Sequence, residues 1–488
     1  MTTTVNLAAE NEPDEQLSST IAHVEAAFET ARRSQRLWAQ SSLRERARII
    51  LAFGRLVLDR EAELLDLIQH ETGKSRRDAF EELTDVVLWS GHVANHGPAL
   101  LRSRGKRGAI PLLTTTTEVR VPKGVVGIIT PWNYPFTLPA TDSLPALIAG
   151  NAVVLKPDRL TPRIADRLLE LLLEAGLPKG VLQIVHGPGA EIGGAVIERA
   201  DFVMFTGSTA TGRVVARQCA ERLIGFSAEL GGKNPLLVLE DADVDRAAPG
   251  AVRASFANAG QLCISTERLY VHAAHWDEFC AKFVEHTEAL RLGPGYDWGI
   301  DMGRLISERQ LATVESHVAD AVDKGARVLA GGRRRPDLGE LFYEPTVLVD
   351  VGPGMIAHRE ETFGPVVSLY RVESDDEAIA LANDSEYGLN ASVWSRRNGE
   401  SVARRLRAGT VNINEGYAAT WSSYASPMGG MKQSGLGRRH GTAGILKYTD
   451  AQTISRQRLI PIAGPDGFGH ERWAGVMSAG ARILRRIP

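Results

Sequence analysis

The sequence contains little cysteine, no excess of charge of one sign and no long hydrophobic run. Three cysteines, Cys219, Cys263 and Cys280, are spread over 488 residues without a CxxC pair, which argues against a disulfide framework and a structural zinc site. Lys and Arg number 56 and Asp and Glu 59, a net charge of -3, whereas a nucleic-acid binder normally has a basic excess. No apolar run reaches membrane-spanning length, and the polar, acidic start of the chain is unlike a signal peptide. We therefore expect a soluble, cytoplasmic protein that binds neither nucleic acid nor a membrane.

Chain length and the pattern of apolar and polar residues predict two α/β lobes and a protruding ribbon. A chain of 488 residues exceeds one ordinary core, and up to about residue 105 apolar residues recur at the three- and four-residue spacing of helices. Thr114 to Pro122 then alternates like an exposed strand. From Gly124 onward, short apolar runs alternate with helical stretches, the pattern of buried parallel strands joined by crossover helices. The runs are GVVGIIT, AVVLKP, VLQIVHG and FVMFTG in the first lobe, and RLYVH, ARVLAGG, TVLVDV, GPVVSLYRV, ASVWS and GTVNIN in the second.

Three polar or glycine-bearing loops follow strands of the first lobe. GVVGIIT is followed by PWNYP, AVVLKP by Asp158 and Arg159, and FVMFTG overlaps the loop Gly207 to Gly212. Ligands of open α/β sheets bind beyond the carboxyl ends of the strands, so these loops predict a cofactor crevice. There is no GxGxxG, although a helix start with glycines can still receive a phosphate on its free N–H groups.

Cys263 lies in FANAGQLCISTER, among small and polar residues rather than the large apolar neighbours of a buried thiol. The residues alone leave two explanations open, a core thiol at the start of a strand and a nucleophile on a flexible turn. Cys219 and Cys280 lie in helical patterns and are expected to be inert.

Eight motifs occur in an order that resembles the aldehyde dehydrogenase superfamily, over roughly residues 20 to 455. They are PWNYP, LKP, FTGS, ELGGKNP, NAGQLC, ETFGPV, YGLNASVWS and GGMKQSGLGR. The resemblance implies a Rossmann-like cofactor domain, an α/β catalytic domain and a β-ribbon oligomerisation arm. The expected boundaries are 1–104 with 123–230 for the cofactor domain, 231–449 for the catalytic domain, 105–122 with 450–460 for the arm, and 461–488 for a C-terminal extension.

The same resemblance implies catalytic roles for three residues. Cys263 aligns with the nucleophile, whose thiolate forms a thiohemiacetal that surrenders hydride to a nicotinamide. Glu229 aligns with the general base, which needs a pKa raised towards neutrality, although a helix-capping glutamate would look similar in sequence. Asn133 aligns with the side-chain amide of the oxyanion hole, where the backbone N–H of Cys263 is the second donor. Without the resemblance, Asn133 would be a turn residue in a proline-rich bend.

Cofactor contacts follow from the resemblance in the same way. Glu361 and Phe363 align with residues that hold the nicotinamide ribose and ring. Arg159 stands where members that prefer NAD generally have a glutamate, and an arginine would attract the 2′-phosphate of NADP. We therefore expect NADP to be preferred, with NAD still accepted. The other expected cofactor-binding residues are Trp132, Asn133, Lys156, Pro157, Asp158, Gly207, Ser208 and Leu230.

The sequence is compatible with two classes of aldehyde substrate. In IGFSAELGGKNP, NAGQLCIS and ASPMGGMKQSG the chain is similar to actinobacterial proteins classed as NADP-linked succinate-semialdehyde dehydrogenases. Characterised succinate-semialdehyde enzymes hold the distal carboxylate with two arginines, at positions where this chain has Thr141 and Ala257. A buried carboxylate would be unpaired there, which favours a less polar aliphatic or aromatic aldehyde.

The residues fit three other functions and a calcium site less well. A cysteine hydrolase would pair Cys263 with a histidine, but no histidine lies in a hydrolase motif, and a catalytically silent binding protein would be expected to lose Cys263 or Glu229. Relatives that acylate coenzyme A typically lack the base glutamate. EDADVD, residues Glu240 to Asp245, lacks the glycine and closing glutamate of an EF-hand, so the acids are better explained as a helix start and no metal is expected.

Assembly is predicted from the ribbon. The strand Thr114 to Pro122 offers exposed edges, which tend to be covered or paired. By resemblance it forms an arm with the chain near Ala451 to Arg458 and reaches a second subunit, giving a homodimer or homotetramer. The basic, amphipathic end of the chain could be an interface helix or a solvated extension.

Overall fold

The computed structural model describes residues 18–108, 114–458 and 460–485. They divide into two compact units, a larger one of residues 1–100 and 122–448 and a smaller one of residues 101–121 and 449–488. Most of the N-terminal stretch that was compared with a signal peptide, residues 1–17, lies outside the described residues. Along the described ranges, no helix combines the length and the apolar character needed to cross a bilayer.

Four helices precede the first buried strand, as the three- and four-residue spacing predicts. α1 begins after Thr20, whose side chain accepts from the His23 N–H, and α3 ends at Gly73, which has φ 71°. The helices are α1 (Ile21–Trp38), α2 (Leu43–Asp59), α3 (Glu61–Thr72) and α4 (Arg76–Leu101).

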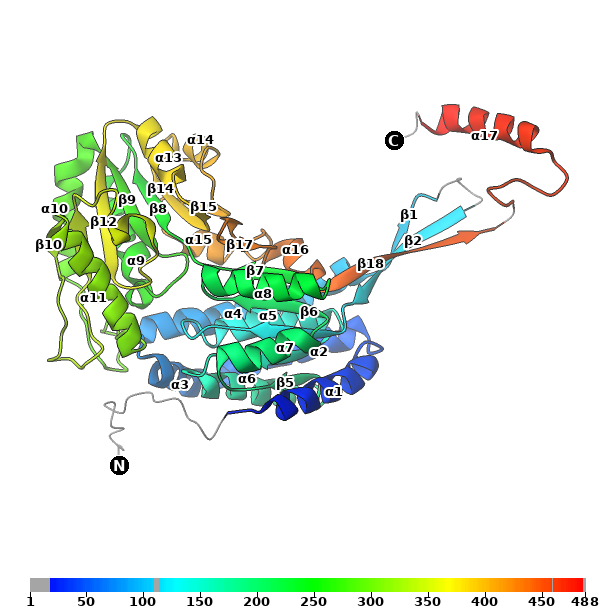
Figure 1. Cartoon of the computed structure of the whole chain (residues 1–488), viewed down its shortest axis with the longest axis horizontal. Helices are drawn as coiled ribbons and strands as arrows, with labels where there is room; N and C mark the ends of the chain where they lie inside the picture. Colours follow the sequence, from blue (N-terminus) through cyan, green and yellow to red (C-terminus); the bar gives the residue numbers. More distant parts are fainter. Residues whose placement is uncertain (1–17, 109–113, 459, 486–488) are drawn as a thin grey trace. The chain divides into compact units, whose positions relative to one another are not determined.

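The first sheet of the larger unit has six strands in the order β17-β7-β6-β3-β4-β5, all parallel except β17. Every residue of β3, β4 and β6 is buried, because α1, α7 and α8 cover one face of the sheet while α5 and α6 also pack against it (Figure 1). α6 has Pro162 at its first turn and stops before Gly176, φ 103°, as predicted. The elements are β3 (Val125–Ile129), α5 (Thr137–Ile148), β4 (Ala152–Lys156), α6 (Pro162–Glu174), β5 (Leu182–Ile184), α7 (Gly194–Arg199), β6 (Phe202–Thr206), α8 (Thr209–Glu221), β7 (Gly225–Glu229) and β17 (Gly435–Leu436).

The second sheet has seven strands in the order β10-β11-β12-β9-β8-β14-β15, all parallel except β10. α9, α10 and α11 pack on one apolar cluster of this sheet, and α13 and α14 on another. The elements are β8 (Asn234–Val238), α9 (Val244–Phe256), β9 (Thr266–His272), α10 (Trp276–Glu288), α11 (Glu308–Asp323), β10 (Arg327–Ala330), β11 (Thr346–Val349), α12 (Ile356–Arg359), β12 (Val366–Val372), α13 (Asp375–Asn383), β13 (Tyr387–Gly388), β14 (Asn390–Trp394), α14 (Gly399–Ala403), β15 (Thr410–Ile413), α15 (Ala418–Trp421), β16 (Met431–Lys432) and α16 (Gly441–Leu446).

Each predicted apolar run contains a strand, but β7 and β8 were missed, as were the two-residue strands β13, β16 and β17. β7 has the mixed sequence GFSAE, and β8 begins with Asn234 and Pro235, so neither begins as the continuous apolar run that marked the others. Proline is unusual in a central strand, and the pairing register with β9 shifts at Pro235. β7 and β8 are consecutive and carry the chain from the first sheet to the second.

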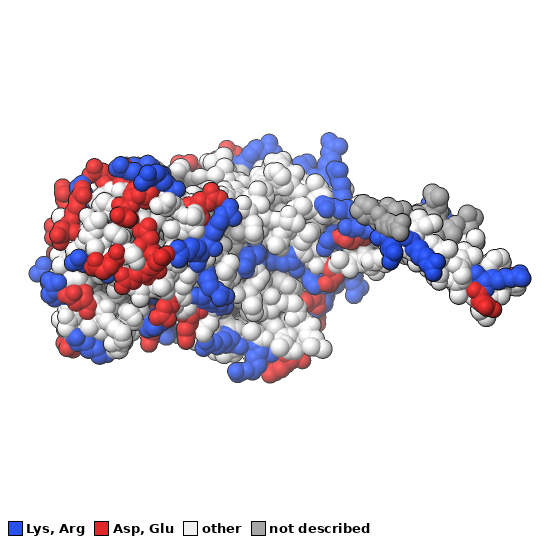
Figure 2. All heavy atoms as spheres, turned by 90° about the horizontal axis from the view of Figure 1, so that it is seen from above, with Lys and Arg blue, Asp and Glu red and all other residues white. Residues whose placement is uncertain are grey.

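The two sheets of the larger unit are joined a second time by a returning segment. After β15 of the second sheet, the chain comes back as β17 and pairs antiparallel with β7, so that Gly435 lies opposite Glu229 (Figure 1). Glu229 is therefore enclosed by both connections between the sheets. On the face drawn in Figure 2, acidic and basic side chains are both present, in keeping with the balanced composition.

The smaller unit consists of a three-stranded sheet in the order β1-β2-β18 and one helix. β1 pairs antiparallel with β2, and the hydroxyls of Thr116 and Ser455 lie 3.0 Å apart between β2 and β18. α17 has no buried residue, and the Trp473 indole donates to the Ile462 carbonyl. That the sheet is an oligomerisation arm stays a prediction, as do the four domain boundaries. The elements are β1 (Arg104–Lys106), β2 (Thr114–Pro122), β18 (Thr449–Gln457) and α17 (His470–Leu484).

Candidate active site

Strands of the first sheet bring the expected site residues to one edge. β3 is followed by Trp132 and Asn133, β4 by Pro157 to Arg159, and β6 by Gly207 and Ser208, while β7 ends on Glu229. Parallel strands present their carboxyl ends at a common edge, so the loops meet there as expected.

The loop before Cys263 has an unusual backbone. Asn258, Ala259 and Gly260 have φ values of 52°, 55° and 70°, three left-handed residues in succession. A side chain at Gly260 would put Cβ 2.1 Å from the Gly364 carbonyl oxygen, so this position admits only glycine. Left-handed residues other than glycine are strained and persist only where the surroundings hold them. The small residues of FANAGQLC thus fit a loop that turns sharply into the thiol.

Hydrogen bonds hold this loop at both ends. The Asn258 N–H donates to Asp78 Oδ2 at 3.0 Å, and the Asn258 side-chain amide donates to the Gln261 carbonyl at 3.0 Å. Beyond the turn, Asn234 Nδ2 donates to the carbonyl of Cys263 at 2.8 Å. The Cys263 side chain is partly buried and packs against an apolar cluster. No sequence motif indicated that Asp78 and Asn234, so far apart in the chain, support the same loop.

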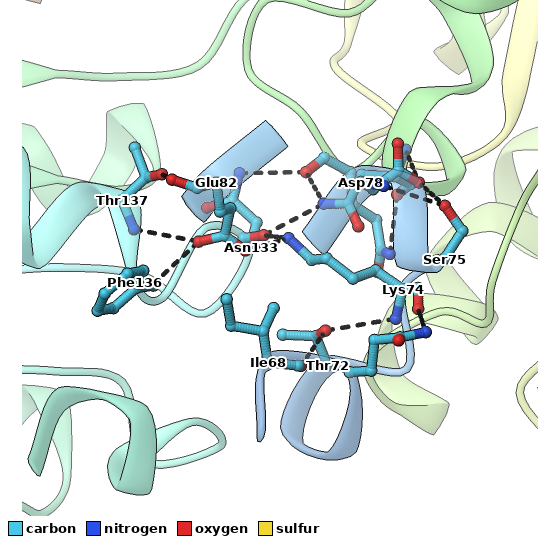
Figure 3. Close-up of polar contacts among 12 residues, drawn as sticks. Ile68, Thr72, Lys74, Ser75, Asp78, Glu82, Asn133, Phe136 and Thr137 are labelled. Carbon is cyan, nitrogen blue, oxygen red and sulfur yellow. Dashed lines mark hydrogen bonds and ion pairs between the residues drawn. The ribbon is translucent and has the colours of Figure 1, made fainter. Parts of the chain in front are cut away.

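Asn133 is oriented by a buried ion pair (Figure 3). Its carbonyl accepts from Lys74 Nζ at 2.7 Å, and Lys74 Nζ is 2.6 Å from Glu82 Oε1, with both side chains almost fully buried. Asn133 Nδ2 donates to the Gln261 carbonyl at 3.1 Å. An amide nitrogen carries two N–H bonds, so the second remains for a ligand oxygen.

The other oxygen of Glu82 fixes the segment after Asn133. Glu82 Oε2 accepts from the N–H groups of Phe136 and Thr137 at 3.0 and 3.1 Å, where α5 begins (Figure 3). A carboxylate at a helix N-terminus satisfies N–H groups that have no partner within the helix. Glu82 therefore sets both the entry into α5 and, through Lys74, the backbone of Asn133.

Glu229 is buried beside cations that its sequence neighbours do not reveal. It is 3% exposed, and its Oε1 has no hydrogen-bond partner among the described residues. Burial raises the pKa of Glu229 from 4.5 to about 7, against the opposing charges of Arg439 and Lys447. Arg439 is itself bound to Asp142, at 2.7 and 3.0 Å, and to the Thr206 hydroxyl at 2.9 Å. The flanks of Glu229 showed no cation because these charges come from the returning segment after β17.

The thiol of Cys263 shares this environment. Burial, aided by the carboxylates of Glu361 and Glu229 and opposed by Arg439, raises its pKa to about 12. The thiol therefore carries its proton at neutral pH, and a neighbouring base is needed to make the thiolate. The other two cysteines lie in α8 and α10, as predicted, and burial raises the pKa of each to about 11.

Two expected nicotinamide contacts lie together. The rings of Trp132 and Phe363 meet edge to face, with centroids 5.6 Å apart. Glu361 Oε1 accepts from the Gly232 N–H at 2.8 Å, and a Cβ on Gly231 would lie 2.3 Å from Glu361 Oε2. Gly231 and Gly232 thus let this carboxyl group approach the backbone between β7 and β8.

The expected phosphate end has an exposed cation, Arg159. Arg159 is exposed and makes no ion pair within the part of the chain that the structure describes. Asp158, which could have neutralised it, accepts instead from the Leu160 N–H at 3.0 Å. Lys156 is 4% exposed, and burial lowers its pKa. Ser208 caps α8 by accepting from the Thr211 N–H, at a helix start that faces the same edge of the sheet.

An apolar cluster adjoins the thiol. Thr141 and Ala257, which stand where succinate-semialdehyde enzymes have their two arginines, are both buried, and Ala257 belongs to this cluster. Three cations of this region are already bound to carboxylates, Lys74 to Glu82, Arg253 to Asp78 and Arg439 to Asp142. The cluster consists of Tyr134, Leu138, Ala257, Leu262, Ile264, Leu389, Tyr417 and Met428, with Cys263 and Trp421 packed against it.

Comparison with known proteins identifies the family. A sequence profile described as the Aldehyde dehydrogenase family matches residues 3–454. The chain belongs to the aldehyde dehydrogenase family. This aldehyde dehydrogenase is 53% identical over 467 residues to a protein of Mycolicibacterium smegmatis, covering 95% of this chain and 90% of that one. A protein of Mycobacterium tuberculosis strain H37Rv is 50% identical over 471 residues, covering 96% and 91%. Both are named "Putative succinate-semialdehyde dehydrogenase" with NADP(+) as the cofactor.

Solved structures confirm the expected α/β fold. A crystal structure described as an Escherichia coli NADP-dependent enzyme matches with a TM-score of 0.87 and 36% identity, covering 90% of this chain and 91% of that one. A betaine aldehyde dehydrogenase of Staphylococcus aureus in complex with NAD+ matches with a TM-score of 0.85 and 33% identity, covering 90% and 88%. The aldehyde dehydrogenase resemblance stated from eight motifs is therefore confirmed.

Replacing Gly260 tests the turn before the thiol. In Gly260→Ala the new Cβ meets the backbone of Gly364, so we expect a loss of stability above the roughly 1–2 kcal/mol that a left-handed residue costs by itself. Gly325→Ala is the matched control, because Gly325 also has positive φ, 103°, but open space around it. Urea unfolding of both variants measures the difference. Equal losses would show that the contact with Gly364 does not constrain the loop.

Proposed function

We propose that this aldehyde dehydrogenase oxidises an aldehyde to a carboxylic acid with NADP, through a covalent adduct on Cys263. One observation carries the proposal: the Cys263 thiol and a Glu229 carboxyl group with a pKa of about 7 lie at the junction of the two sheets, beside the amide of Asn133. A thiol that keeps its proton needs a base, and a carboxyl group that titrates near neutrality can be ionised to receive that proton as the sulfur attacks.

The chain supplies the acid–base and electrostatic parts of the reaction. Ionised Glu229 takes the thiol proton, and the sulfur of Cys263 attacks the aldehyde carbon. The oxygen becomes negative and is bound by the free amide N–H of Asn133 and the backbone N–H of Cys263. A bound oxidised nicotinamide would supply the hydride acceptor, so that the thiohemiacetal on Cys263 could become a thioester. Glu229 then releases the thiol proton to solvent and, ionised again, takes a proton from the water that attacks the thioester. The acid leaves, and the thiolate of Cys263 takes its proton back from Glu229.

Several features of the chain fit a dinucleotide with a 2′-phosphate. We assign the nicotinamide ring to Trp132 and Phe363, its ribose to Glu361, and the 2′-phosphate to Arg159. The edge-to-face ring pair, the close approach of Glu361 to Gly231, and the unpaired, exposed guanidinium support this assignment. The other expected contacts, from Lys156 to Asp158, at Gly207 and Ser208, and at Leu230, belong to the same proposal. The NADP(+) in the names of the relatives supports it as well.

Two substrate classes remain candidates. Succinate semialdehyde is suggested by the names of the relatives. The apolar cluster and the paired state of Lys74, Arg253 and Arg439 favour an aldehyde without a second charge. We also propose that the enzyme is a cytoplasmic homo-oligomer, paired through the arm of residues 105–122 and 450–460, and that the first sheet binds cofactor while the second carries the catalytic cysteine.

Steady-state assays of reduced-cofactor absorbance with a panel of aldehydes test the function. Cys263→Ala should abolish turnover, whereas Cys219→Ala and Cys280→Ala should retain it.

Glu229→Gln should slow hydrolysis of the thioester, so that intact-mass measurement finds acyl-enzyme. Since Glu229 acts as a base only when ionised, wild-type turnover should fall as the pH drops below about 7. Wild-type activity in Cys263→Ala would refute the mechanism.

Cofactor choice is tested at Arg159. A charge-assisted bond to the 2′-phosphate is worth about 1.5–3 kcal/mol, so Arg159→Glu should weaken NADP at least about tenfold. NAD should bind better, because a carboxylate can accept from the free 2′-hydroxyl. Titration calorimetry with both cofactors measures the change. An unaltered ratio of the two dissociation constants would mean that another group holds the phosphate.

A further inference from the structure

Carboxylates of α4 bind a segment rich in aromatic residues. Asp85 is 4% exposed, and its Oδ1 accepts from Trp421 Nε1 at 2.6 Å and from the Tyr424 hydroxyl at 2.9 Å. One turn earlier, Glu81 Oε2 accepts from the Tyr417 hydroxyl at 3.0 Å. Two side chains on one face of α4 thus bind three aromatic donors of residues 417–424, a segment that no sequence motif linked to α4.

Two of these aromatic residues, Tyr417 and Trp421, pack in or against the apolar cluster that adjoins the thiol. Trp421 and Cys263 pack against the same apolar cluster. The Trp421 ring lies 5.3 Å from that of Tyr134, tilted by 51°, and 6.4 Å from that of Tyr417. Trp421 ends α15, a helix of only four residues, so its own backbone gives it little support. The bond from its indole to Asp85 is therefore the main directional constraint on the ring.

We propose that Asp85 is a positioning residue that sets aldehyde specificity by holding Trp421 against Tyr134 beside Cys263. The two rings then form an aromatic wall that accepts an uncharged aldehyde carrying an aryl group. This inference rests on the proposed function of Cys263 and adds to it the residue that selects the substrate.

Asp85 is suited to this role because its carboxylate is already bound to side chains of the aromatic segment. Burial is the main cause that raises the pKa of Asp85 to about 7, and the charge of Glu82 acts in the same direction. The hydrogen bonds from Tyr424 and Trp421 and the charge of Arg439 act in the opposite direction. At pH 8 the ionised form prevails, and its bond to the indole is charge-assisted. With two donors on one oxygen, Asp85 serves the aromatic segment rather than a substrate cation.

Binding of benzaldehyde tests the proposal without turnover. The measurement is titration calorimetry at pH 8 on protein carrying Cys263→Ala, which forms no covalent adduct. Adding Asp85→Ala should raise the Kd of benzaldehyde about tenfold, whereas Asp85→Asn, which keeps an acceptor oxygen, should change it less than about threefold. The Kd of propionaldehyde, which has no ring to stack, should stay within about twofold of its value before the change.

Tyr424→Phe is the matched control, because it removes the other donor from the same oxygen and leaves the indole bonded. It should change the Kd of benzaldehyde less than Asp85→Ala does. If Asp85→Ala does not fold, Trp421→Phe has to raise this Kd by itself. An unchanged Kd in these variants, or an equal rise for both aldehydes, overturns the proposal. Failure of the wild-type enzyme to oxidise any aldehyde would contradict the proposed function instead, and the binding result would still stand.

Discussion

Burial of Glu229, with partial burial of Cys263, at the junction of two sheets is the constraint on which the chemistry of this protein depends. Glu229 ends a strand of the first sheet, and Cys263 precedes a strand of the second. Burial raises both pKa values, so the thiol is neutral and the carboxyl group titrates near pH 7. Arg439 and Lys447 limit the shift at Glu229. A base that titrates near neutrality is the result of this balance between desolvation and nearby cations.

The same region is held by ion pairs that are themselves buried. Lys74 with Glu82 and Arg439 with Asp142 are nearly inaccessible to water. Such pairs contribute little net stability, but removal of one partner costs about 3–5 kcal/mol because the other charge is left alone. The geometry of these pairs therefore resists change. The pair of Lys74 and Glu82 fixes the position of the Asn133 carbonyl, and the pair of Arg439 and Asp142 fixes a cation beside Glu229.

Features of the fold and the site that depend on neighbouring residues could be predicted from the sequence, whereas those that depend on distant residues could not. Apolar runs predicted most strands, and the carboxyl-end rule placed the cofactor loops at one edge. β7 and β8 were missed because their composition is mixed and because Pro235 is atypical of a central strand. The bond from Trp421 to Asp85 joins residues 336 positions apart, and the cations near Glu229 are also far from it in the chain, so no local pattern encodes these pairings. Ala259 in a left-handed conformation was equally invisible, since alanine does not favour it.

Infrared difference spectroscopy during a pH titration tests the effect of desolvation most directly. Subtracting spectra of Glu229→Gln isolates the carboxyl C=O band of Glu229, and protein with Cys219→Ala and Cys280→Ala retains only the S–H band of Cys263. A buried junction predicts that the C=O band is lost at about pH 7 and that the S–H band persists beyond pH 10, because burial holds the thiol pKa at about 12. Loss of the C=O band near pH 4.5, together with loss of the S–H band near pH 9, would contradict it.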